Sequence, residues 1–568
     1  MLCFWPEVQA GAVPDLCWGE GIAPKDARTA SGVVSPPFKR RPERDLAVEP
    51  WKPWDELLAE LQAKEENAKL GGGRDRQEAQ KAKGKMLCRE RLEALVDPGS
   101  FHEINALAET QTFEFDMQKK KILGDGVVTG FAAIQGRKVF VYSQDVTVFG
   151  GSAGRAHGEK INLMLRMARK AGAPVIGLYE SAGGRLQDGM QNESGYGQMF
   201  FENTQCSGVV PQIAGIMGAC TGGGVYSPAI MDFIIQVKKT APMFITGPGV
   251  IKEVTGEEIS FDRLGGTGVH TRRSGVAHLA ADNDAHCCQL IRRLLSYLPS
   301  NNREAPPAVE VRDDAERINQ VLTEIVPAEP TKTYDMRLVI SELMDLGDFF
   351  EIQPAFAKNM VIGFGRLDGK SVGVVANQPR HLGGVIDIDA ADKAARFIRF
   401  CDCFNIPLVI LADVPGYMPG SDQEYKGIIR HGAKMLYAFS EATVPKVTIV
   451  LRKYYGGAIP AMCCHETGAD LLLAWPTAEF AMIGSKAAVP ILYRKEIAKA
   501  ADPEKLRREK IVEYKETIMS PYYSASKQYI DGVIRPADTR RWLIWSLDLL
   551  KDKKVEGQPW KKHGNLPL

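Results

Sequence analysis

The sequence predicts an α/β protein made of two tandem domains that arose by duplication and are preceded by N-terminal helices. The first observation is a set of residues that returns 233 positions later, so that Gly130-Phe131 is matched by Gly363-Phe364. The second is that each copy alternates short β-branched strands with an amphipathic helix. The third is length, because 568 residues with 45% apolar and 25% charged composition can build two cores.

Composition excludes several classes of protein. The formal net charge of +1 gives no electrostatic reason to expect a nucleic-acid partner. No run of 18 apolar residues occurs, so we predict no direct membrane insertion. The eleven cysteines show no CxxC spacing and the nine histidines no cluster, so we predict reduced thiols, no metal site and a cytoplasmic protein.

The chain begins with a segment unlike the rest. Residues 1–50 are rich in Pro and Gly without a sustained period, which predicts a disordered or irregular extension. A helix is predicted over Trp54 to Lys69, stopped by Gly71-Gly72-Gly73. A second charged helix is predicted from about Arg74 to Leu95. We expect both helices to lie outside the core with their charges in solvent.

The repeat extends well beyond one dipeptide. The 233-position shift preserves every identity across two sets of residues, namely Gly136, Gly150-Gly151, Lys160, Pro174 and Gly183, and Gly369, Gly383-Gly384, Lys393, Pro407 and Gly416. Agreement at one constant offset indicates two copies of one unit. A period this long indicates duplicated domains rather than a solenoid.

Each copy contains the same predicted elements in the same order. A strand, a glycine turn and a second strand lead to a Gly-Gly loop, an amphipathic helix and a buried strand that ends in an acid and a Gly-rich turn. The helices are predicted over Gly158 to Ala171 and Ala390 to Cys403, and the buried strands over Val175 to Tyr179 and Leu408 to Leu411. The Pro-, Asn- and Glu-rich stretch from Leu298 to Ala328 reads as a linker. We therefore predict domains at 51–310 and 320–568, called here the first and second halves.

A further pair of loops carries the predicted chemistry. The loops Thr221–Tyr226 and Tyr455–Pro460 each follow an apolar strand and precede a helix-like stretch. Glycines and a small alanine at such a turn expose backbone N–H groups at a helix N-terminus, which suits a developing oxyanion. An isolated glycine pair is more often only a tight turn. Two related copies in one chain favour the oxyanion interpretation.

Two other motifs are set aside. Gly150-Gly151-Ser152-Ala153-Gly154 fits the nucleophile elbow of serine hydrolases, but the second copy keeps only the glycine pair, Gly383-Gly384, and has no matching serine. Gly365 to Ser371 suggests a phosphate-binding loop, but Phe364 occupies the required glycine position.

Long segments of the chain resemble one family. They include DVTVFGGSAGRAHGEKI, TGGGVYSPAIMDF and GVAH in the first half, and NQPRHLGGVIDIDAADKAARFIRFCDCFNIPLV, DVPGYMPGSDQEYKGIIRHGAKMLYAFSEATVPKVT and AWPTAEFAMIG in the second. These segments resemble carboxyltransferase subunits of biotin-dependent acyl-CoA carboxylases. Propionyl-CoA carboxylase β chains and methylmalonyl-CoA decarboxylase α chains are the most similar, and the resemblance covers about residues 55–568.

The resemblance implies a fold, an assembly and an activity. The fold would be two crotonase-like (ClpP/crotonase) domains, in a homohexamer that is a trimer of dimers. The active site would lie between the first half of one subunit and the second half of its dimer mate. The enzyme would be the ligase-type carboxyltransferase component that moves a carboxyl group between carboxybiotin and the α-carbon of an acyl-CoA such as propionyl-CoA or acetyl-CoA. The base would be the biotin nitrogen itself, so no catalytic side chain is expected.

The resemblance also implies site residues. It assigns the catalytic oxyanion loops to Gly222 and Gly223 in the first half and to Gly457 and Ala458 in the second. Substrate binding would involve Gly183, Gly184, Arg185, Gly224, Tyr226, Ile459 and Pro460. Contact with the biotin cofactor would involve Gly416, Gly457 and Ala458.

Two positions depart from the family pattern. Pro460 stands where propionyl-CoA carboxylases have an Asp that is linked to the choice of acyl group, so the acyl group stays open. The turn at Ser181-Ala182-Gly183-Gly184-Arg185 replaces the usual Ser-Gly-Gly-Ala-Arg.

The partners follow from motifs that the sequence lacks. It contains no Ala-Met-Lys-Met biotinylation site and no Gly-rich ATP-binding segment, so biotin would arrive on a biotin carboxyl carrier protein. ATP would be used only by a biotin carboxylase partner, or by an α subunit that fuses carboxylase and carrier. A sodium-pumping decarboxylase α subunit is the alternative. A biotin-independent crotonase-type hydratase or isomerase would need paired carboxylates, for which the first half offers only Glu180 and Asp188.

Overall fold

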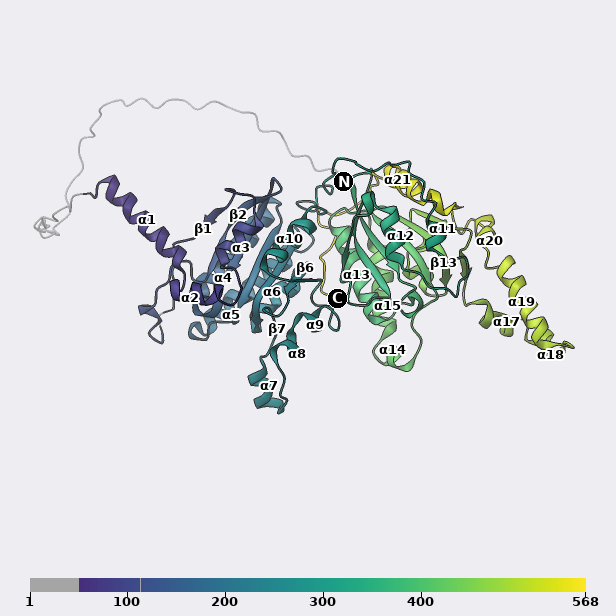
Figure 1. Ribbon diagram of the computed structural model, residues 1–568, viewed down its shortest axis with the longest axis horizontal. Coiled ribbons are helices and arrows are strands. Elements are labelled where there is room, and N and C mark those ends of the chain that lie inside the picture. Colours follow the sequence, from purple (N-terminus) through teal and green to yellow (C-terminus); the bar gives the residue numbers. More distant parts are fainter. Residues whose placement is uncertain (1–50, 113) are drawn as a thin grey trace, which may run out of the picture. The chain divides into compact units, whose positions relative to one another are not determined.

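The computed structural model describes residues 51–112 and 114–568 (Figure 1). The predicted extension at 1–50 lies outside the described residues. Residues 58–568 form one compact unit that holds both halves, and the beginning of helix α1 (Trp54–Leu70) belongs to the other unit, Met1–Leu57.

The first half is built on an eight-stranded sheet. Its order is β1-β2-β3-β4-β5-β6-β8, with β7 beside β5. Strands β1 to β3 pair antiparallel and the others pair parallel. The strands are β1 (His102–Ile104), β2 (Val127–Ile134), β3 (Arg137–Gln144), β4 (Val175–Ser181), β5 (Gln212–Thr221), β6 (Phe233–Val237), β7 (Met243–Phe244) and β8 (Leu279–Ala281).

The second half repeats this sheet with the same pairing. Its order is β16-β14-β13-β12-β11-β10-β9, with β15 beside β13. The strands are β9 (Phe349–Ile352), β10 (Met360–Leu367), β11 (Lys370–Asn377), β12 (Leu408–Val414), β13 (Lys446–Tyr455), β14 (Leu471–Ala474), β15 (Glu479–Ala481) and β16 (Gly532–Val533). The register repeats too, because Phe140 pairs with Val175 and Gly373 with Leu408, both at the 233-position shift. The predicted duplication is confirmed.

Helices cover the sheets in matching positions. In the first half α4 (Arg155–Ala171) packs on α5 (Met190–Cys206), and in the second α13 (Ile388–Cys403) packs on α15 (Ile428–Glu441). The other first-half helices are α6 (Tyr226–Ile230), α7 (Pro248–Thr255), α8 (Phe261–Gly265), α9 (Thr267–His270) and α10 (Asp284–Leu295). The remaining helices are α11 (Leu322–Ile325), α12 (Met336–Leu343), α14 (Ser421–Tyr425), α16 (Ala458–Ala461), α17 (Ser485–Leu492), α18 (Arg494–Lys499), α19 (Pro503–Thr517), α20 (Pro521–Ser526) and α21 (Thr539–Leu549).

The repeated lysine has a structural role in both halves. Lys160 on α4 donates to the carbonyl oxygens of Gly124 and Val127. Lys393 on α13 donates to carbonyls that include Phe356 at 2.8 Å. Both side chains are buried, and burial lowers the pKa of Lys160 to about 8. The ammonium therefore ties each helix to the segment that leads into the sheet.

The predicted second N-terminal helix is wrong in extent and in exposure. It is two helices, α2 (Arg74–Lys81) and α3 (Cys88–Leu95), separated by a turn in which Gly84 has φ 72°. Arg91 on α3 is fully buried, with its guanidinium 2.7 Å from Glu180 and 2.7 Å from Asp284. Because α3 packs its apolar side directly on the sheet, this arginine faces the interior rather than solvent.

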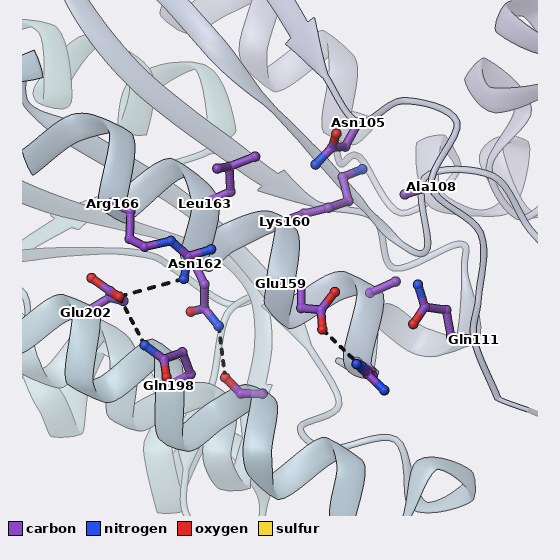
Figure 2. Close-up of a pocket in the computed structure, with 13 residues that line it drawn as sticks. Asn105, Ala108, Gln111, Glu159, Lys160, Asn162, Leu163, Arg166, Gln198 and Glu202 are labelled. Atoms are coloured by element: carbon purple, nitrogen blue, oxygen red, sulfur yellow. Dashed lines mark hydrogen bonds and ion pairs between the residues drawn. The ribbon is translucent and has the colours of Figure 1, made fainter. Parts of the chain in front are cut away.

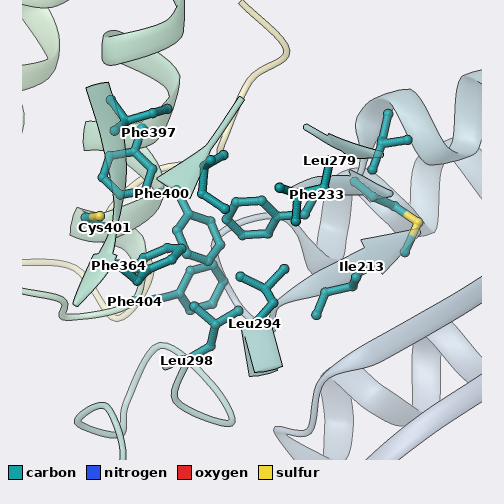
Figure 3. Close-up of a cluster of buried hydrophobic side chains, with 14 of the residues drawn as sticks. Ile213, Phe233, Leu279, Leu294, Leu298, Phe364, Phe397, Phe400, Cys401 and Phe404 are labelled. Atoms are coloured by element: carbon teal, nitrogen blue, oxygen red, sulfur yellow. The ribbon is translucent and has the colours of Figure 1, made fainter. Parts of the chain in front are cut away.

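The two halves meet through a continuous apolar core (Figure 3). The ring of Phe233 on β6 lies 4.6 Å from that of Phe400 on α13 and 6.0 Å from that of Phe364 on β10. Leu294 and Leu298, at the end of the first half, are buried in the same cluster. Helix α13 is therefore held between its own sheet and the edge of the first half.

Three observations bear on the composition-based predictions. The nine cysteines that the structure describes are all buried and free. Within residues 51–568, Phe113 aside, no helix has both the length and the apolar content needed to cross a membrane. The same residues contain no group of three or more His, Cys, Asp or Glu side chains placed to hold a metal ion.

Candidate functional site

The two predicted oxyanion loops are structural equivalents. In the first half β5 leads into a short 3₁₀ helix, Gly222–Val225, and in the second half β13 leads into α16. Gly222 and Gly456 open the loops with φ of 55° and 58°. Their N–H groups donate to the carbonyls of Ile245 (3.1 Å) and Ala481 (2.8 Å). The first amide of each loop is thus committed to a hydrogen bond of the fold.

The backbone N–H groups of the next two residues in each loop are the candidate donors to a reactant. Gly223 corresponds to Gly457, and both are accessible; Gly224 corresponds to Ala458, and both are buried. The first N–H groups of a helix have no acceptor within that helix and carry partial positive charge. Each loop can therefore present backbone donors to an oxygen on which negative charge develops.

A tyrosine ring lies against each loop. The Cβ of any larger residue at position 223 would be 3.2 Å from the ring of Tyr196, a contact tighter than normal, which explains the glycine there. At position 457 the nearest ring is Tyr417, at 3.7 Å from a Cβ, which is ordinary contact. The first loop is therefore packed more tightly than the second.

Buried hydroxyl groups hold both loops in place. Below the first loop Ser227 donates to Asn203 (2.8 Å) and lies 2.9 Å from the hydroxyl of Tyr179. Below the second, the hydroxyl of Tyr454 donates to the carbonyl of Ile459 at 2.8 Å. Burial raises the pKa of both tyrosines well above the usual value, so the phenols remain protonated donors. These supporting residues were not predicted, because their positions depend on tertiary packing.

A cavity of about 710 Å³ opens beside the first loop. The predicted substrate residues Gly183, Gly184 and Arg185 line it, together with Gly222 and Ile245. Every lining residue belongs to the first half. The structure thus brings Gly183, Gly184, Arg185 and Gly222 together around one cavity, whereas the predicted residues Gly223, Gly224 and Tyr226 do not line it.

Arg185 lines the cavity, but the contacts of its side chain hold neighbouring segments of the protein together. Its guanidinium is buried, 2.8 Å from Asp125, donates to the carbonyl of Ser152 (3.0 Å) and stacks over the ring of Phe149. It therefore ties the Gly-Gly loop to the strand ends around the cavity.

The remaining predicted residues occupy matching places. Gly416 is the equivalent of Gly183, since their carbonyls accept from Ile386 (3.1 Å) and Ala153 (2.9 Å). Tyr226 is partly exposed and sets its ring edge-on against Phe200 at 5.8 Å.

Pro460 fits a short helix. Ile459 and Pro460 are half-buried within α16, and Pro460 is the third residue of that helix. A missing N–H has little cost in the first turn of a helix, where no intrahelical acceptor exists for it.

The carboxylates near the loops are all engaged. Glu180 accepts from Arg91, Lys85 and Gln80. Asp188 accepts from the hydroxyl of Thr112 and from the N–H of Arg155. In the second half Asp413 forms a buried ion pair with Arg452 at 2.9 Å. A paired, solvent-excluded carboxylate is a poor general base, so the backbone donors are the chemically useful groups here.

A larger cavity of about 970 Å³ lies elsewhere (Figure 2). It is formed by the outer faces of α4 and α5 and by the loop that contains Asn105. Both acidic side chains in its lining are paired. Glu159 lies 3.0 Å from Arg155, and Glu202 lies 3.7 Å from Arg166 and accepts from Gln198 at 3.0 Å, as Figure 2 shows. None of the predicted site residues lines it.

Comparison with known proteins now decides the family. Residues 79–566 match the model of the carboxyl transferase domain. The chain belongs to the carboxyl transferase family. This carboxyltransferase is 54% identical over 514 residues to the carboxyltransferase subunit of propionyl-CoA carboxylase from Haloferax mediterranei, an alignment covering 90% of this chain and 99% of the relative. It is 49% identical to the methylmalonyl-CoA decarboxylase α subunit of Veillonella parvula, with 90% and 98% covered.

A solved structure is similar along the same length. The transcarboxylase 12S structure, a hexamer with methylmalonyl-CoA and methylmalonic acid bound, matches with a TM-score of 0.88 and 48% identity, covering 91% of this chain and 99% of that one. The predicted fold and family are confirmed. The protein is an enzyme of the propionyl-CoA carboxylase β and transcarboxylase family.

Proposed function

We propose that this carboxyltransferase moves a carboxyl group between biotin on a separate carrier protein and the α-carbon of a short acyl-CoA, using one oxyanion loop for each reactant. The observation that supports this is the pair of equivalent loops, each with an accessible residue followed by a buried one. Two reactants that develop negative charge on oxygen need two such sites, and the duplication supplies them.

The first loop is assigned to the thioester. Removal of a proton α to a thioester places negative charge on its carbonyl oxygen. The N–H groups of Gly223 and Gly224 are the proposed donors, because the N–H of Gly222 is bonded to Ile245. The adjacent 710 Å³ cavity would hold the acyl-CoA against Gly183 and Gly184.

The second loop is assigned to biotin, which supplies the carboxyl group when it is bound. Gly457 and Ala458 would donate to its ureido oxygen, with the backbone of Gly416 at the rim. The surroundings fit a neutral ring system, since Ala458, Ile459 and Pro460 bring no charge to the loop. The protein's contribution is to hold the oxygen and to stabilise the charge that develops there.

Both loops fit an active site shared between subunits. Exposed apolar side chains flank the first loop at Ile245 and Val250, and the second at Met482. Apolar side chains grouped around a functional loop favour burial against another subunit. We propose that the first half of one subunit faces the second half of its dimer mate.

The duplication also supports a ring of subunits. In the second half, the face of α13 around Lys393 and Arg396 is covered by Asp232 and Phe233 of the first half. The equivalent face of α4, around Lys160 and its neighbours, is the open 970 Å³ cavity. The edge of another subunit's second half, where Asp470 corresponds to Asp232, would cover it. Head-to-tail contacts form a ring when the rotation between subunits closes, and a closed ring of this kind is compatible with the proposed homohexamer.

The proposal also covers the acyl group that accepts the carboxyl group and the direction in which the transfer runs. We favour the carboxylase direction, with propionyl-CoA or acetyl-CoA as acceptor, a biotin carboxylase partner that consumes ATP, and a cytoplasmic location. The 54% identity to a propionyl-CoA carboxylase subunit supports this direction. The 49% identity to a decarboxylase α subunit keeps that enzyme as the second candidate. Pro460 leaves the preferred acyl chain to experiment.

The test is direct transfer. Purified protein is incubated with biotinylated carrier and with malonyl-, methylmalonyl- or glutaconyl-CoA, and carboxyl transfer to biotin is followed by mass spectrometry. Transfer from at least one thioester supports the proposal and identifies the acyl group. An intact hexamer that transfers from none of them would overturn it.

A further inference from the structure

A separate cavity of about 330 Å³ lies where the two halves meet, because Arg272 of the first half lines it together with residues of the second. None of the residues assigned to the oxyanion loops lines it. Its side chains include Arg272, Arg337, Lys358 and His381, with one acid, Glu351. A partly open space with four basic side chains and one carboxyl group has the composition of an anion site.

The duplication explains why this space is open. In the first half the equivalent place is filled by the turn between α1 and α2. There the N–H of Gly72 donates to the hydroxyl of Thr147 (3.0 Å), and Arg76 donates to the carbonyl of the same residue (3.0 Å). In the second half the chain before α12 instead directs the carbonyls of Pro327, Glu329 and Lys332 to Arg452. Among the residues that the structure describes, no segment takes the place of the first-half turn, so the cavity remains.

The charges in the cavity are also arranged differently from those of the first half. Elements before the repeat correspond at a shift of 248, from Cys88 at the start of α3 to Met336 at the start of α12. In the first half Arg89 forms a two-pronged ion pair with Glu103, at 2.6 and 2.9 Å. In the second half the equivalent Arg337 turns to Asp335, at 2.6 and 2.9 Å, and leaves Glu351 without it.

Two further cations in the cavity have no acidic partner. Among residues 51–568 that the structure describes, no carboxylate lies within 4.0 Å of the guanidinium of Arg272 or the ammonium of Lys358. Both side chains are exposed at this partly open cavity. An anion that entered it would be attracted by two positive charges that no carboxylate neutralises.

We propose that this cavity binds a phosphate group, either inorganic phosphate or the phosphate of a nucleotide-like ligand. Guanidinium groups match phosphate oxygens with paired hydrogen bonds, and a lysine adds a compact positive charge. Arg272 and Lys358 together balance a phosphate that carries about two negative charges near neutral pH. The volume exceeds that of a single phosphate, which leaves space for an attached ribose.

Titratable groups in the cavity agree with this assignment. Burial, followed by the nearby Lys358 and Arg337, lowers the pKa of His381, and burial raises the pKa of Glu351. A bound anion raises the pKa of His381, and protonation of Glu351 removes the one opposing charge. At a fixed charge of the phosphate, proton uptake by either group therefore favours binding of the anion. The charged groups that act on His381 are Lys358, Arg337, Asp335 and Arg380.

The test measures binding to the full-length hexamer by calorimetry, without any transfer reaction. The probes are inorganic phosphate, ADP, CoA and dephospho-CoA. The variants are Arg272→Ala and Lys358→Ala, with Arg273→Ala as the matched control, because Arg273 is the exposed neighbour that does not line the cavity. We expect saturable binding of at least one probe, weakened roughly tenfold or more by each cavity variant and unchanged by the control.

The pattern of probes identifies the source of the phosphate. Tight binding of inorganic phosphate supports a free-phosphate site. Binding of CoA but not dephospho-CoA, lost in Arg272→Ala, supports a site for the 3′-phosphate. Binding of ADP alone supports a nucleotide. Absence of saturable binding by every probe up to about 10 mM, or equal affinity in all variants, would overturn the inference while leaving the transfer reaction untouched.

Discussion

Replacement of Ala458 by Pro removes one proposed hydrogen-bond donor and adds almost no bulk. Ala458 is the first residue of α16, and its side chain is fully buried. Proline is tolerated in the first turn of a helix, so the helix itself should survive. The preceding Gly457 sits at φ −63° and ψ −14°, a region disfavoured before proline, which adds local strain. The loop amide is the group that disappears.

The expected magnitude follows from the cost of losing one oxyanion donor. Such a loss costs about 3 kcal/mol, which lowers kcat by a factor of about 10² to 10³. The carboxyl transfer assay with biotinylated carrier measures it. Ala458→Gly keeps the amide and serves as the control, with a loss of less than about tenfold expected because only a buried methyl group is removed. Gel filtration and thermal unfolding establish that both variants remain assembled.

Two outcomes with Ala458→Pro and Ala458→Gly would refute this reasoning. If Ala458→Pro transfers carboxyl groups at the parental rate in an intact assembly, the amide of residue 458 has no part in the reaction. If Ala458→Gly loses as much activity as Ala458→Pro, the methyl group rather than the amide carries the effect.

Three other expectations follow from the same geometry. Gly223→Ala should lower kcat more than Gly457→Ala, because its Cβ would lie 3.2 Å from the Tyr196 ring against 3.7 Å from Tyr417; the reverse order would contradict the packing argument. Tyr454→Phe removes the hydrogen bond to Ile459 and should lower kcat about fivefold through loss of about 1 kcal/mol, with an unchanged KM for acyl-CoA; a change confined to KM would assign Tyr454 to binding. Arg91→Met leaves Glu180 buried with fewer partners and should destabilise the fold by about 3 kcal/mol in chemical unfolding, whereas Arg89→Met, at a partly exposed pair, should change it by less than about 1 kcal/mol.

The sequence alone determined the duplication and the position of the loops. Repetition survives in the residues that a β-turn or a close backbone approach requires, such as the glycines at 150 and 383 with φ of 67° and 64°. Helix and strand cores were predictable because periodicity directly reflects which side faces the sheet. The family was predicted from long, specific segments, and the comparisons confirm it.

Only the tertiary structure decided which amides are free. The sequences of the two loops do not distinguish Gly222 from Gly223. In the structure the N–H of Gly222 donates to the carbonyl of Ile245, more than twenty positions away, and the N–H of Gly223 does not make that bond. The same holds for Arg91 and Lys85, whose charged neighbourhood predicts solvent exposure although both reach Glu180. Long-range hydrogen bonds and buried ion pairs depend on which segments the fold brings together. The local sequence around a residue does not specify those distant segments.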